Sequence, residues 1–358
     1  MSLEEQAKMG EKRRSVVIHS AGSYDRLRME EEEVPEVGPD EVLVEVVAIG
    51  INYADVIVRM GLYASAKEYV GWPITPGFEV AGRIADLGSD VKGWALGDEV
   101  CALTRFGGYT THLVTRQEYL FKKPESMSFE EAAGLPTVFL TAWYALCELA
   151  HPREGAKMLI HSAAGGVGGS LIQVGKAMGC EVVGVVGGAH KVETARLHGA
   201  DHVIDKSNKD LWAEAEKHAP EGYDVILDAN GVATLKESYD HLRRAGKLVV
   251  YGFHTMMPKK GGKPNLLKLA TGWLQTPRFN PLDMTNQSKS VMAFNLSYLF
   301  DRTDILELAI EDLERWIKDG AVKAAPVTVY SLDHVAQAHA DIESGRTIGK
   351  LILKTDLA

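Results

Sequence analysis

The sequence is poor in cysteine, and its three cysteines stand far apart at Cys101, Cys147 and Cys180. An odd number of widely spaced cysteines with no C-x-x-C pair forms no disulfide framework and favours a reducing compartment. The sequence also lacks any apolar run approaching the roughly 18 residues that a membrane-spanning helix needs. Its first residues, MSLEEQAKMGEKRR, are too polar for a signal peptide. We therefore expect a cytoplasmic protein without a membrane span.

Positive charge is in deficit, because 39 lysines and arginines face 49 aspartates and glutamates, for a net charge of −10. This balance argues against non-specific binding of nucleic acid. The 358 residues suffice for two domains, and a hydrophobic fraction of 46% is ordinary for a globular protein. We find no internal repeat and no low-complexity tract.

The most informative stretch is 157–191, whose pattern predicts a strand, a glycine-rich turn, a helix and a second strand. The apolar runs 158–161 and 181–186 suit buried strands, and Leu171, Val174 and Met178 have the spacing of one helix face. The turn reads Ala163-x-Gly165-x-x-Gly168, a form of the dinucleotide-binding fingerprint. Gly165 lets the backbone approach a pyrophosphate, and Gly168 lets the helix pack on the strand. Glycines also make ordinary tight turns, but this position favours cofactor binding at the helix N-terminus.

The end of the second strand indicates which dinucleotide binds. An NAD site usually has Asp or Glu about 20 residues beyond the glycines, where it binds the ribose 2′-hydroxyl. Here that place holds Gly187 and Gly188, and Lys191 follows on the next helix. A missing carboxylate and a nearby cation suit a 2′-phosphate, so we predict NADPH rather than NADH. The alternative is that Lys191 is an ordinary solvated lysine.

The hydrophobic pattern divides the rest of the chain into a β-rich region and a region of alternating strands and helices. Short apolar runs separated by turns predict a largely β region over 15–115, with one helix near Tyr53. After the central unit, strands (202–205, 224–228, 247–252 and 291–296) alternate with helices (190–198, 208–219 and 232–244), which predicts a doubly wound parallel sheet. A helix over 303–319, a strand over 326–330, a helix over 333–344 and a last strand, KLILK, close the chain.

Residues 254–290 break this alternation, with a basic stretch from Lys259 to Lys263 followed by the apolar piece NLLKLATGWLQ. This segment suits a lid, a dimer contact or an amphipathic surface that touches a membrane. We favour a lid or packing role, because the apolar piece is short.

A second informative stretch, GINYADVIVRMGLY over 50–63, predicts a strand end at Asn52 followed by a helix that terminates at Gly61. Together with TPGFEVAGRI (75–84), the glycine turn and RTIGKLIL (346–353), it resembles the medium-chain dehydrogenase/reductase superfamily. The match covers about Ser15 to Lys354 and is most similar to the zinc-free quinone oxidoreductase branch. Two later segments, YGFHTMMPKKGG (251–262) and MAFNLSYL (292–299), resemble the vesicle amine transport protein subfamily.

The resemblance implies an α/β fold in which a doubly wound, NADPH-binding Rossmann domain (139–299) is inserted into a β-rich GroES-like domain (1–138 and 300–358). It also implies a homodimer and a cleft where NADPH and substrate meet. By position it assigns Tyr63 and Asn52 to catalysis. The cofactor contacts that it implies are Asn52, Thr141, Ala164, Gly165, Gly166, Val167, Gly187, Lys191, Asn230, Gly252, Phe253, Phe294, Asn295 and Lys350.

Zinc does not fit these spacings. Zinc-dependent relatives carry a His in a G-H-E motif, which here reads Gly77-Phe78-Glu79, and three scattered cysteines cannot supply a four-cysteine site. Without a Lewis acid, hydride addition to a quinone or an α,β-unsaturated carbonyl is easier than alcohol oxidation, and water or Tyr63 can supply the proton. Two alternatives stay open: enoyl-thioester reduction, and a low-turnover NADPH-binding protein that acts in vesicle or membrane association. We expect His161 and His198 to be structural.

Overall fold

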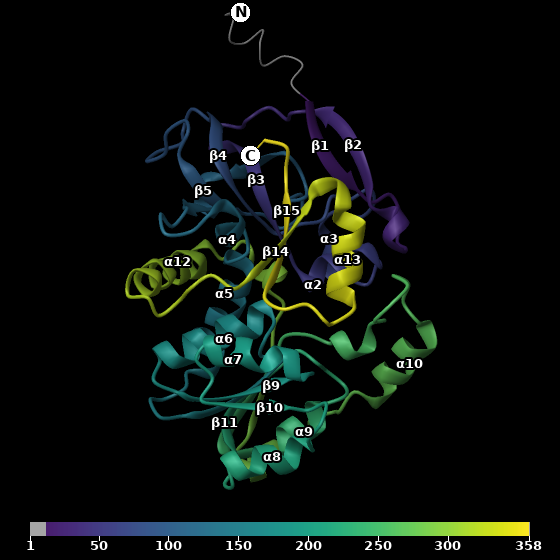
Figure 1. Ribbon diagram of the computed structural model, residues 1–358, viewed down its shortest axis with the longest axis vertical. Helices are drawn as coiled ribbons and strands as arrows, with labels where there is room; N and C mark the ends of the chain where they lie inside the picture. Colours follow the sequence, from purple (N-terminus) through teal and green to yellow (C-terminus); the bar gives the residue numbers. More distant parts are fainter. Residues whose placement is uncertain (1–11, 358) are drawn as a thin grey trace, which may run out of the picture.

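The computed structural model describes residues 12–357 and contains two large sheets, which lie in the lower and upper halves of Figure 1. The lower sheet has six parallel strands in the order β10-β9-β8-β11-β12-β13. Its strands are β8 (Lys157–His161), β9 (Glu181–Val186), β10 (His202–Asp205), β11 (Tyr223–Asp228), β12 (Leu242–Val250) and β13 (Ser290–Ala293). The order reverses between β8 and β11, as in doubly wound dinucleotide-binding sheets. The predicted α/β fold with a parallel sheet is confirmed.

Both faces of this sheet are buried, because successive side chains of each strand point to opposite sides. In β8, Met158 and Ile160 belong to one apolar cluster, whereas Leu159 belongs to another. This explains why the strands read as continuous apolar runs rather than as alternating ones. The helices of this half are α6 (Gly166–Ala177), α7 (Val192–Leu197), α8 (Leu211–His218) and α9 (Leu235–Asp240).

The upper sheet has seven strands in the order β14-β15-β3-β4-β5-β7, with β6 paired to β3. Its strands are β3 (Glu41–Ile51), β4 (Glu79–Leu87), β5 (Glu99–Leu103), β6 (His112–Arg116), β7 (Leu120–Lys122), β14 (Val327–Ser331) and β15 (Lys350–Lys354). Because β15 pairs with β3 in antiparallel register, the two ends of the chain share one sheet. The proposed domain limits at 138/139 and 299/300 stay a prediction.

The remaining elements surround the upper sheet and join it to the lower one. A separate hairpin pairs β1 (Lys12–Val17) with β2 (Arg28–Glu33). The helices are α2 (Tyr53–Arg59), α3 (Ala64–Tyr69), α4 (Phe129–Ala133), α5 (Pro136–Trp143), α12 (Thr303–Lys318) and α13 (Val335–Glu343), with a π-helical segment over Tyr144–Ala150. A capping box of Ser128 and Glu131 is present at the start of α4.

Two predictions of local structure need correction. The helix expected over 232–244 ends at Asp240, and β12 begins at Leu242 because that residue pairs with Tyr223 on the neighbouring strand. Leu242 buries its side chain in the core of the lower sheet, so tertiary packing overrides the helical pattern. The polar stretch 1–13 favours a loose tail by its sequence, but Lys12 and Arg13 belong to β1, and residues 1–11 lie outside the described residues.

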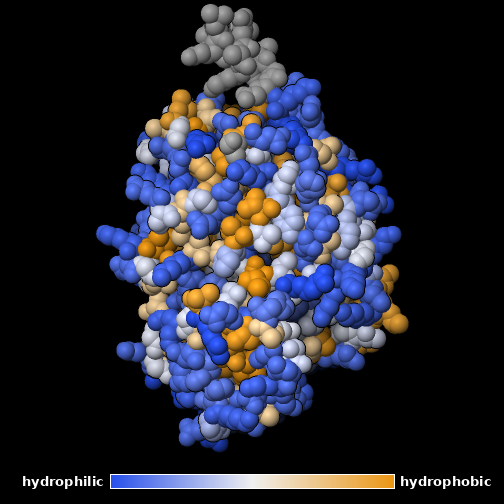
Figure 2. All heavy atoms as spheres, viewed as in Figure 1, coloured by the Kyte–Doolittle hydropathy of each residue, from blue (hydrophilic) through white to orange (hydrophobic). Residues whose placement is uncertain are grey.

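The segment between β12 and β13 forms α10 (Leu266–Gln275) and α11 (Pro281–Gln287), after the short helix η5 (His254–Met256). In α10 only Gly272 is fully buried. Leu266, Leu267 and Leu274 are each more than 70% exposed. Figure 2 shows hydrophobic residues at the edge where Figure 1 places α10. No helix within residues 12–357 is long and apolar enough to cross a membrane.

A buried ion pair ties this segment to the upper half. Arg59 of α2 contacts Glu343 of α13 at 2.8 Å, and both side chains are fully buried. Glu343 also accepts hydrogen bonds from the Tyr24 hydroxyl and from the backbone N–H of Gly262, while Arg59 donates to the Gly262 carbonyl. Gly262 is therefore fixed between two helices of the upper half, which sets where α10 begins.

Breaking this ion pair should destabilise the protein strongly. Arg59→Met keeps a side chain of similar length but leaves the buried carboxylate of Glu343 without its cation, which costs about 3–5 kcal/mol. Urea unfolding measures the change. The matched control is Arg83→Met, because the Arg83–Glu99 pair is about half exposed and should lose no more than about 1 kcal/mol. Similar losses in the two variants would contradict the importance of the buried pair.

Candidate functional site

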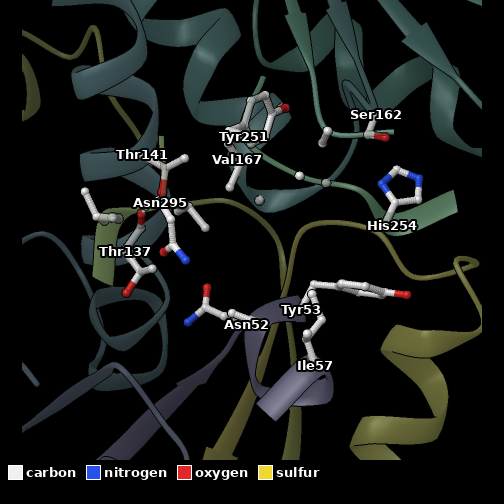
Figure 3. Close-up of a pocket in the computed structure, with 18 of the residues that line it drawn as sticks. Asn52, Tyr53, Ile57, Thr137, Thr141, Ser162, Val167, Tyr251, His254 and Asn295 are labelled. Carbon is white, nitrogen blue, oxygen red and sulfur yellow. Dashed lines mark hydrogen bonds between the residues drawn. The ribbon is translucent and has the colours of Figure 1, made fainter. Parts of the chain in front are cut away.

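A cavity of about 1210 Å³ lies between the two sheets. All of the predicted site residues line it except Asn230. In Figure 3, Asn52, Thr137, Thr141 and Asn295 lie on one side of the cavity, and Tyr53, Ile57 and His254 lie on the other. Asn230 is completely buried behind the wall, where its amide oxygen accepts a 3.4 Å hydrogen bond from Ser162. The structure therefore gives Asn230 no direct contact with the cavity.

The glycine-rich turn forms the edge of the cavity at the N-terminus of α6. Ala164, Gly165, Gly166 and Val167 all line the cavity. The first N–H groups of a helix have no partner within it, so this end of α6 attracts an anion. A Cβ atom on Gly165 would have only the Ser162 carbonyl within 4 Å, at 3.4 Å, so a ligand can approach the backbone here. The turn fits a pyrophosphate.

A cluster of lysines lies at the Gly187 end of the cavity. Lys191, Lys206 and Lys259 all line it, and the Nζ atom of Lys191 donates a 2.6 Å hydrogen bond to the Gly345 carbonyl. Burial, followed by the positive charges of Lys206 and Lys259, lowers the pKa of Lys191. A Cβ atom on Gly187 would meet nothing within 4 Å, so there is open space beside these cations. This end of the cavity fits a phosphate group.

The sequence indicated only the first of these three lysines. Lys206 directly follows β10, and its position after a parallel strand was a usable signal, because ligands bind at the carboxyl ends of such strands. Lys259 comes from the segment after β12, and no local pattern relates it to the other two. Only the fold brings the three segments together.

Asn52 is held in one orientation by charged partners. Its amide oxygen accepts a 2.6 Å hydrogen bond from Lys350, and its amide nitrogen donates a 2.8 Å bond to Glu79. Lysine only donates and a carboxylate only accepts, so the two ends of the amide cannot exchange. Glu79 also pairs with Lys350 at 2.7 Å and accepts from the backbone N–H of Thr137. The second N–H of Asn52 is left free to donate into the cavity.

The predicted residues Tyr63 and Asn295 contact each other. The Tyr63 hydroxyl donates a 2.9 Å hydrogen bond to the amide oxygen of Asn295, which also accepts from the backbone and the hydroxyl of Ser297. The Tyr63 ring packs edge-on against Phe78 and Phe106. Burial raises the pKa of Tyr63, so its hydroxyl stays protonated at neutral pH. This arrangement suits a positioning role.

Several cavity residues were not predicted from the sequence. His254 packs edge-on against Tyr53, and burial, followed by the positive charge of Lys206, lowers its pKa to about 4, so it is neutral at pH 7. The Thr137 and Tyr251 hydroxyls are buried beside the cavity without a hydrogen-bond partner. Beside them, the predicted Thr141 donates its hydroxyl hydrogen to the Thr137 carbonyl, which leaves its oxygen able to accept. These groups are available to a ligand's polar atoms.

Comparisons with known proteins agree with this architecture. A family model described as "Zinc-binding dehydrogenase" matches residues 198–353, and one described as "Alcohol dehydrogenase GroES-like domain" matches residues 38–125. The synaptic vesicle membrane protein VAT-1 homolog of Danio rerio is 33% identical over 344 residues, which cover 96% of this chain and 70% of that protein. The chain belongs to the medium-chain dehydrogenase/reductase superfamily.

Within this superfamily of oxidoreductases, the chain is VAT-1-like and belongs to the quinone oxidoreductase branch. The human VAT-1 homolog-like protein has a TM-score of 0.81 and 28% identity, covering 96% of this chain and 98% of that one. Escherichia coli quinone oxidoreductase, solved in complex with NADPH, has a TM-score of 0.82 and 28% identity, covering 96% of this chain and all of that one. The resemblance stated from the sequence motifs is confirmed at both levels.

The described residues do not fit the zinc that one family description mentions. Phe78 takes the central place of the Gly77-Phe78-Glu79 motif and packs 5.3 Å from Phe106, measured between ring centroids. Both oxygens of Glu79 are engaged, by Asn52 and Lys350 on one and by Thr137 on the other. Within residues 12–357, no three His, Cys, Asp or Glu side chains are grouped to hold a metal ion. No step of the reaction below is assigned to a metal.

Gly168 and Gly187 should differ in their tolerance of a side chain. A Cβ atom on Gly168 would lie 2.3 Å from the Ser162 carbonyl oxygen and 2.8 Å from Ala163 Cα, and neither backbone atom can move cheaply. We expect Gly168→Ala to lose about 1–3 kcal/mol of stability. The matched change Gly187→Ala enters open space and should stay within about 0.5 kcal/mol of the parent. Urea unfolding measures both, and equal losses would refute close helix–strand contact at Gly168.

Proposed function

We propose that the protein is an NADPH-dependent reductase that transfers hydride to quinones or α,β-unsaturated carbonyls without zinc. The observation that carries this proposal is that one cavity joins an anion-binding edge, running from Gly165 to the lysine cluster, to the oriented amide of Asn52. The NADPH complex of the Escherichia coli relative supports the cofactor assignment. Enoyl-thioester reduction would use the same geometry with a larger acyl group.

The cofactor assignment follows from charge. The pyrophosphate would bind at the backbone N–H groups that open α6, and the 2′-phosphate would bind among Lys191, Lys206 and Lys259. Among the described residues that line the cavity, the one carboxylate is that of Glu343, and it is already paired with Arg59 rather than free for a ribose 2′-hydroxyl. Three mutually repelling cations gain more from a phosphate than from a neutral hydroxyl. Asn52, Thr141, Gly252, Phe253, Phe294 and Asn295 would surround the nicotinamide end.

The chemistry requires a donor that stabilises charge on the substrate oxygen. When bound, the reduced nicotinamide supplies one hydride. The free N–H of Asn52 would donate a hydrogen bond to the carbonyl oxygen and stabilise the negative charge that develops there. Lys350 and Glu79 hold this amide in place before substrate arrives, so no reorganisation is needed. Water then protonates the product, because the Tyr63 hydroxyl is engaged with Asn295 and has a raised pKa.

A low-turnover role at membranes is the second candidate, and the exposed apolar face of α10 favours it. The vesicle-membrane names of the relatives point the same way. Lys260, Lys263 and Lys268 lie beside or within this helix and would attract an anionic lipid surface. We place this role second because the cavity holds the polar groups that a reductase needs. The homodimer stays a prediction, and β13, an edge strand of the six-stranded sheet, offers a surface on which a second copy could pair.

The cofactor proposal predicts selective losses from the lysine cluster. Lys191→Ala, Lys206→Ala and Lys259→Ala should each weaken NADPH binding by about 10–100-fold and leave NADH binding almost unchanged, because only NADPH carries the 2′-phosphate. This range corresponds to the loss of one charge-assisted hydrogen bond, about 1.5–3 kcal/mol. Titration of nicotinamide fluorescence measures both dissociation constants. Lys236→Ala, on the exposed surface, is the control, and equal losses for NADH and NADPH would contradict the assignment.

The reaction proposal predicts different effects at Asn52 and Tyr63. Asn52→Ala should lower kcat with quinones and enals about 10²–10³-fold, the usual cost of one donor to a developing oxyanion. Tyr63→Phe should lower it less than about tenfold, since Ser297 still holds Asn295. Steady-state NADPH oxidation measures both.

The same assay separates the two candidate functions. A larger loss at Tyr63 than at Asn52 would reverse their roles. NADPH binding without turnover of any quinone or enal, together with co-sedimentation with anionic liposomes, would favour the membrane role instead.

A further inference from the structure

Part of the apolar lining of the cavity lies outside the set of proposed cofactor contacts. Its volume of about 1210 Å³ exceeds the roughly 300–1,000 Å³ of an ordinary small-molecule pocket. The proposed cofactor contacts lie mainly at the edge of the six-stranded sheet. Side chains from four other segments also line the cavity, namely Tyr53, Ile57, Leu62, Met256, Leu269 and Ile342. We call this second set the apolar strip.

The strip belongs to one hydrophobic cluster, whose buried core is Val56, Met60 and Met257. Its own members are only partly buried, because they line the cavity while packing on that core. Apolar groups facing a solvent-accessible cavity gain hydrophobic free energy when an apolar ligand covers them. Methionine adapts to flexible ligands, since its side chain has three rotatable bonds.

The strip begins at the reaction site and ends at the surface. Tyr53 follows Asn52 directly in the chain, and Ile57 lies one turn further along α2. At the other end, Trp273 lines the cavity and is also 66% exposed. At 100° per residue, Trp273 and the exposed residues Leu266 and Leu274 lie on one face of α10. A chain longer than the cavity can therefore leave beside Trp273 and still contact apolar side chains.

The charged side chains near the strip are not placed to pair with a charged ligand tail. Glu343 lines the cavity but is paired with Arg59. Lys191, Lys206 and Lys259 lie at the Gly187 end, where the cofactor phosphate is proposed to bind. The strip consequently suits an uncharged aliphatic chain.

We propose that the substrate carries such a tail, which binds along the apolar strip while its conjugated carbonyl or quinone head lies at Asn52. This inference rests on the proposed reductase function, because that function places the head. It narrows the substrate class from small enones to amphipathic ones with a flexible aliphatic chain. A compact substrate would leave the strip uncovered.

A chain-length series tests the proposal. With NADPH and trans-2-alkenals from six to twelve carbons, each kept below its solubility limit, KM should fall about two- to fourfold per added methylene. Leu269→Gln places an amide in the strip and should make KM almost independent of chain length. Leu267→Gln is the matched control, because this leucine of the same helix is 74% exposed and does not line the cavity. Its chain-length dependence should equal that of the parent.

A binding measurement tests the tail site without depending on catalytic turnover. Quenching of tryptophan fluorescence by 1-hexanol, 1-octanol and 1-decanol should give dissociation constants that fall with chain length in the parent and stay flat in Leu269→Gln. Equal KM values for short and long alkenals would overturn the tail site and leave the reductase function standing. If neither quinones nor alkenals are reduced, the reductase function is wrong, and the alkanol titration alone decides the tail site: flat dissociation constants refute it.

Discussion

The ammonium group of Lys350 lies between the carbonyl of Ile51, the amide oxygen of Asn52 and the carboxylate of Glu79. It reaches them from the first residue of β15, almost 300 positions further along the chain. A cation this deeply buried is tolerated only when its acceptors are all in place. The Asn52 side of the cavity therefore depends on β15 pairing with β3, and forms only when both ends of the chain meet.

Tight packing around this network explains its rigidity. A Cβ atom on Gly50 would lie 2.4 Å from both the Glu79 carboxylate and the Ala133 carbonyl. Only glycine therefore allows β3 to lie this close to Glu79 and Ala133. The stem of Lys350 fills the space beside Gly134 and Gly166, where a Cβ atom would come within about 3.0 and 3.3 Å of it. The glycine-rich turn that opens α6 and the amide of Asn52 thus contact one common side chain. Their relative position is set by packing rather than by a flexible loop.

How much the sequence predicted depended on whether a signal was local. The central strand-turn-helix-strand unit was predictable, because buried parallel strands read as apolar runs and the turn needs glycines at fixed spacing. The strand at Leu242 was not, because its pairing with Tyr223 is tertiary and its sequence continues a helical pattern. The predicted residues line the cavity, except for Asn230, which packs behind the cavity wall. There the Asp228 carboxylate accepts the N–H groups of Asn230 and Gly231 and closes the turn.

The parts of the site that escaped prediction are those built from distant segments. Glu79 was noted only as part of a motif that lacks a metal-binding histidine, yet it orients Asn52 from 27 residues away. Nothing in the local pattern relates Lys259 to Lys191, and the apolar strip draws on four separate segments. Periodicity places a residue on a helix or a strand, but it does not say which side chains meet across a cleft.

The distribution of the lysine cluster over three segments has a consequence for changing cofactor preference. In many dinucleotide-binding proteins a single acidic residue at the end of the second strand recruits the ribose hydroxyl. An aspartate introduced at Gly187 would here face Lys191, Lys206 and Lys259 and would be neutralised by them. Redesign toward the unphosphorylated dinucleotide would therefore have to remove cations from several loops at once, because removing one lysine leaves two others beside the phosphate.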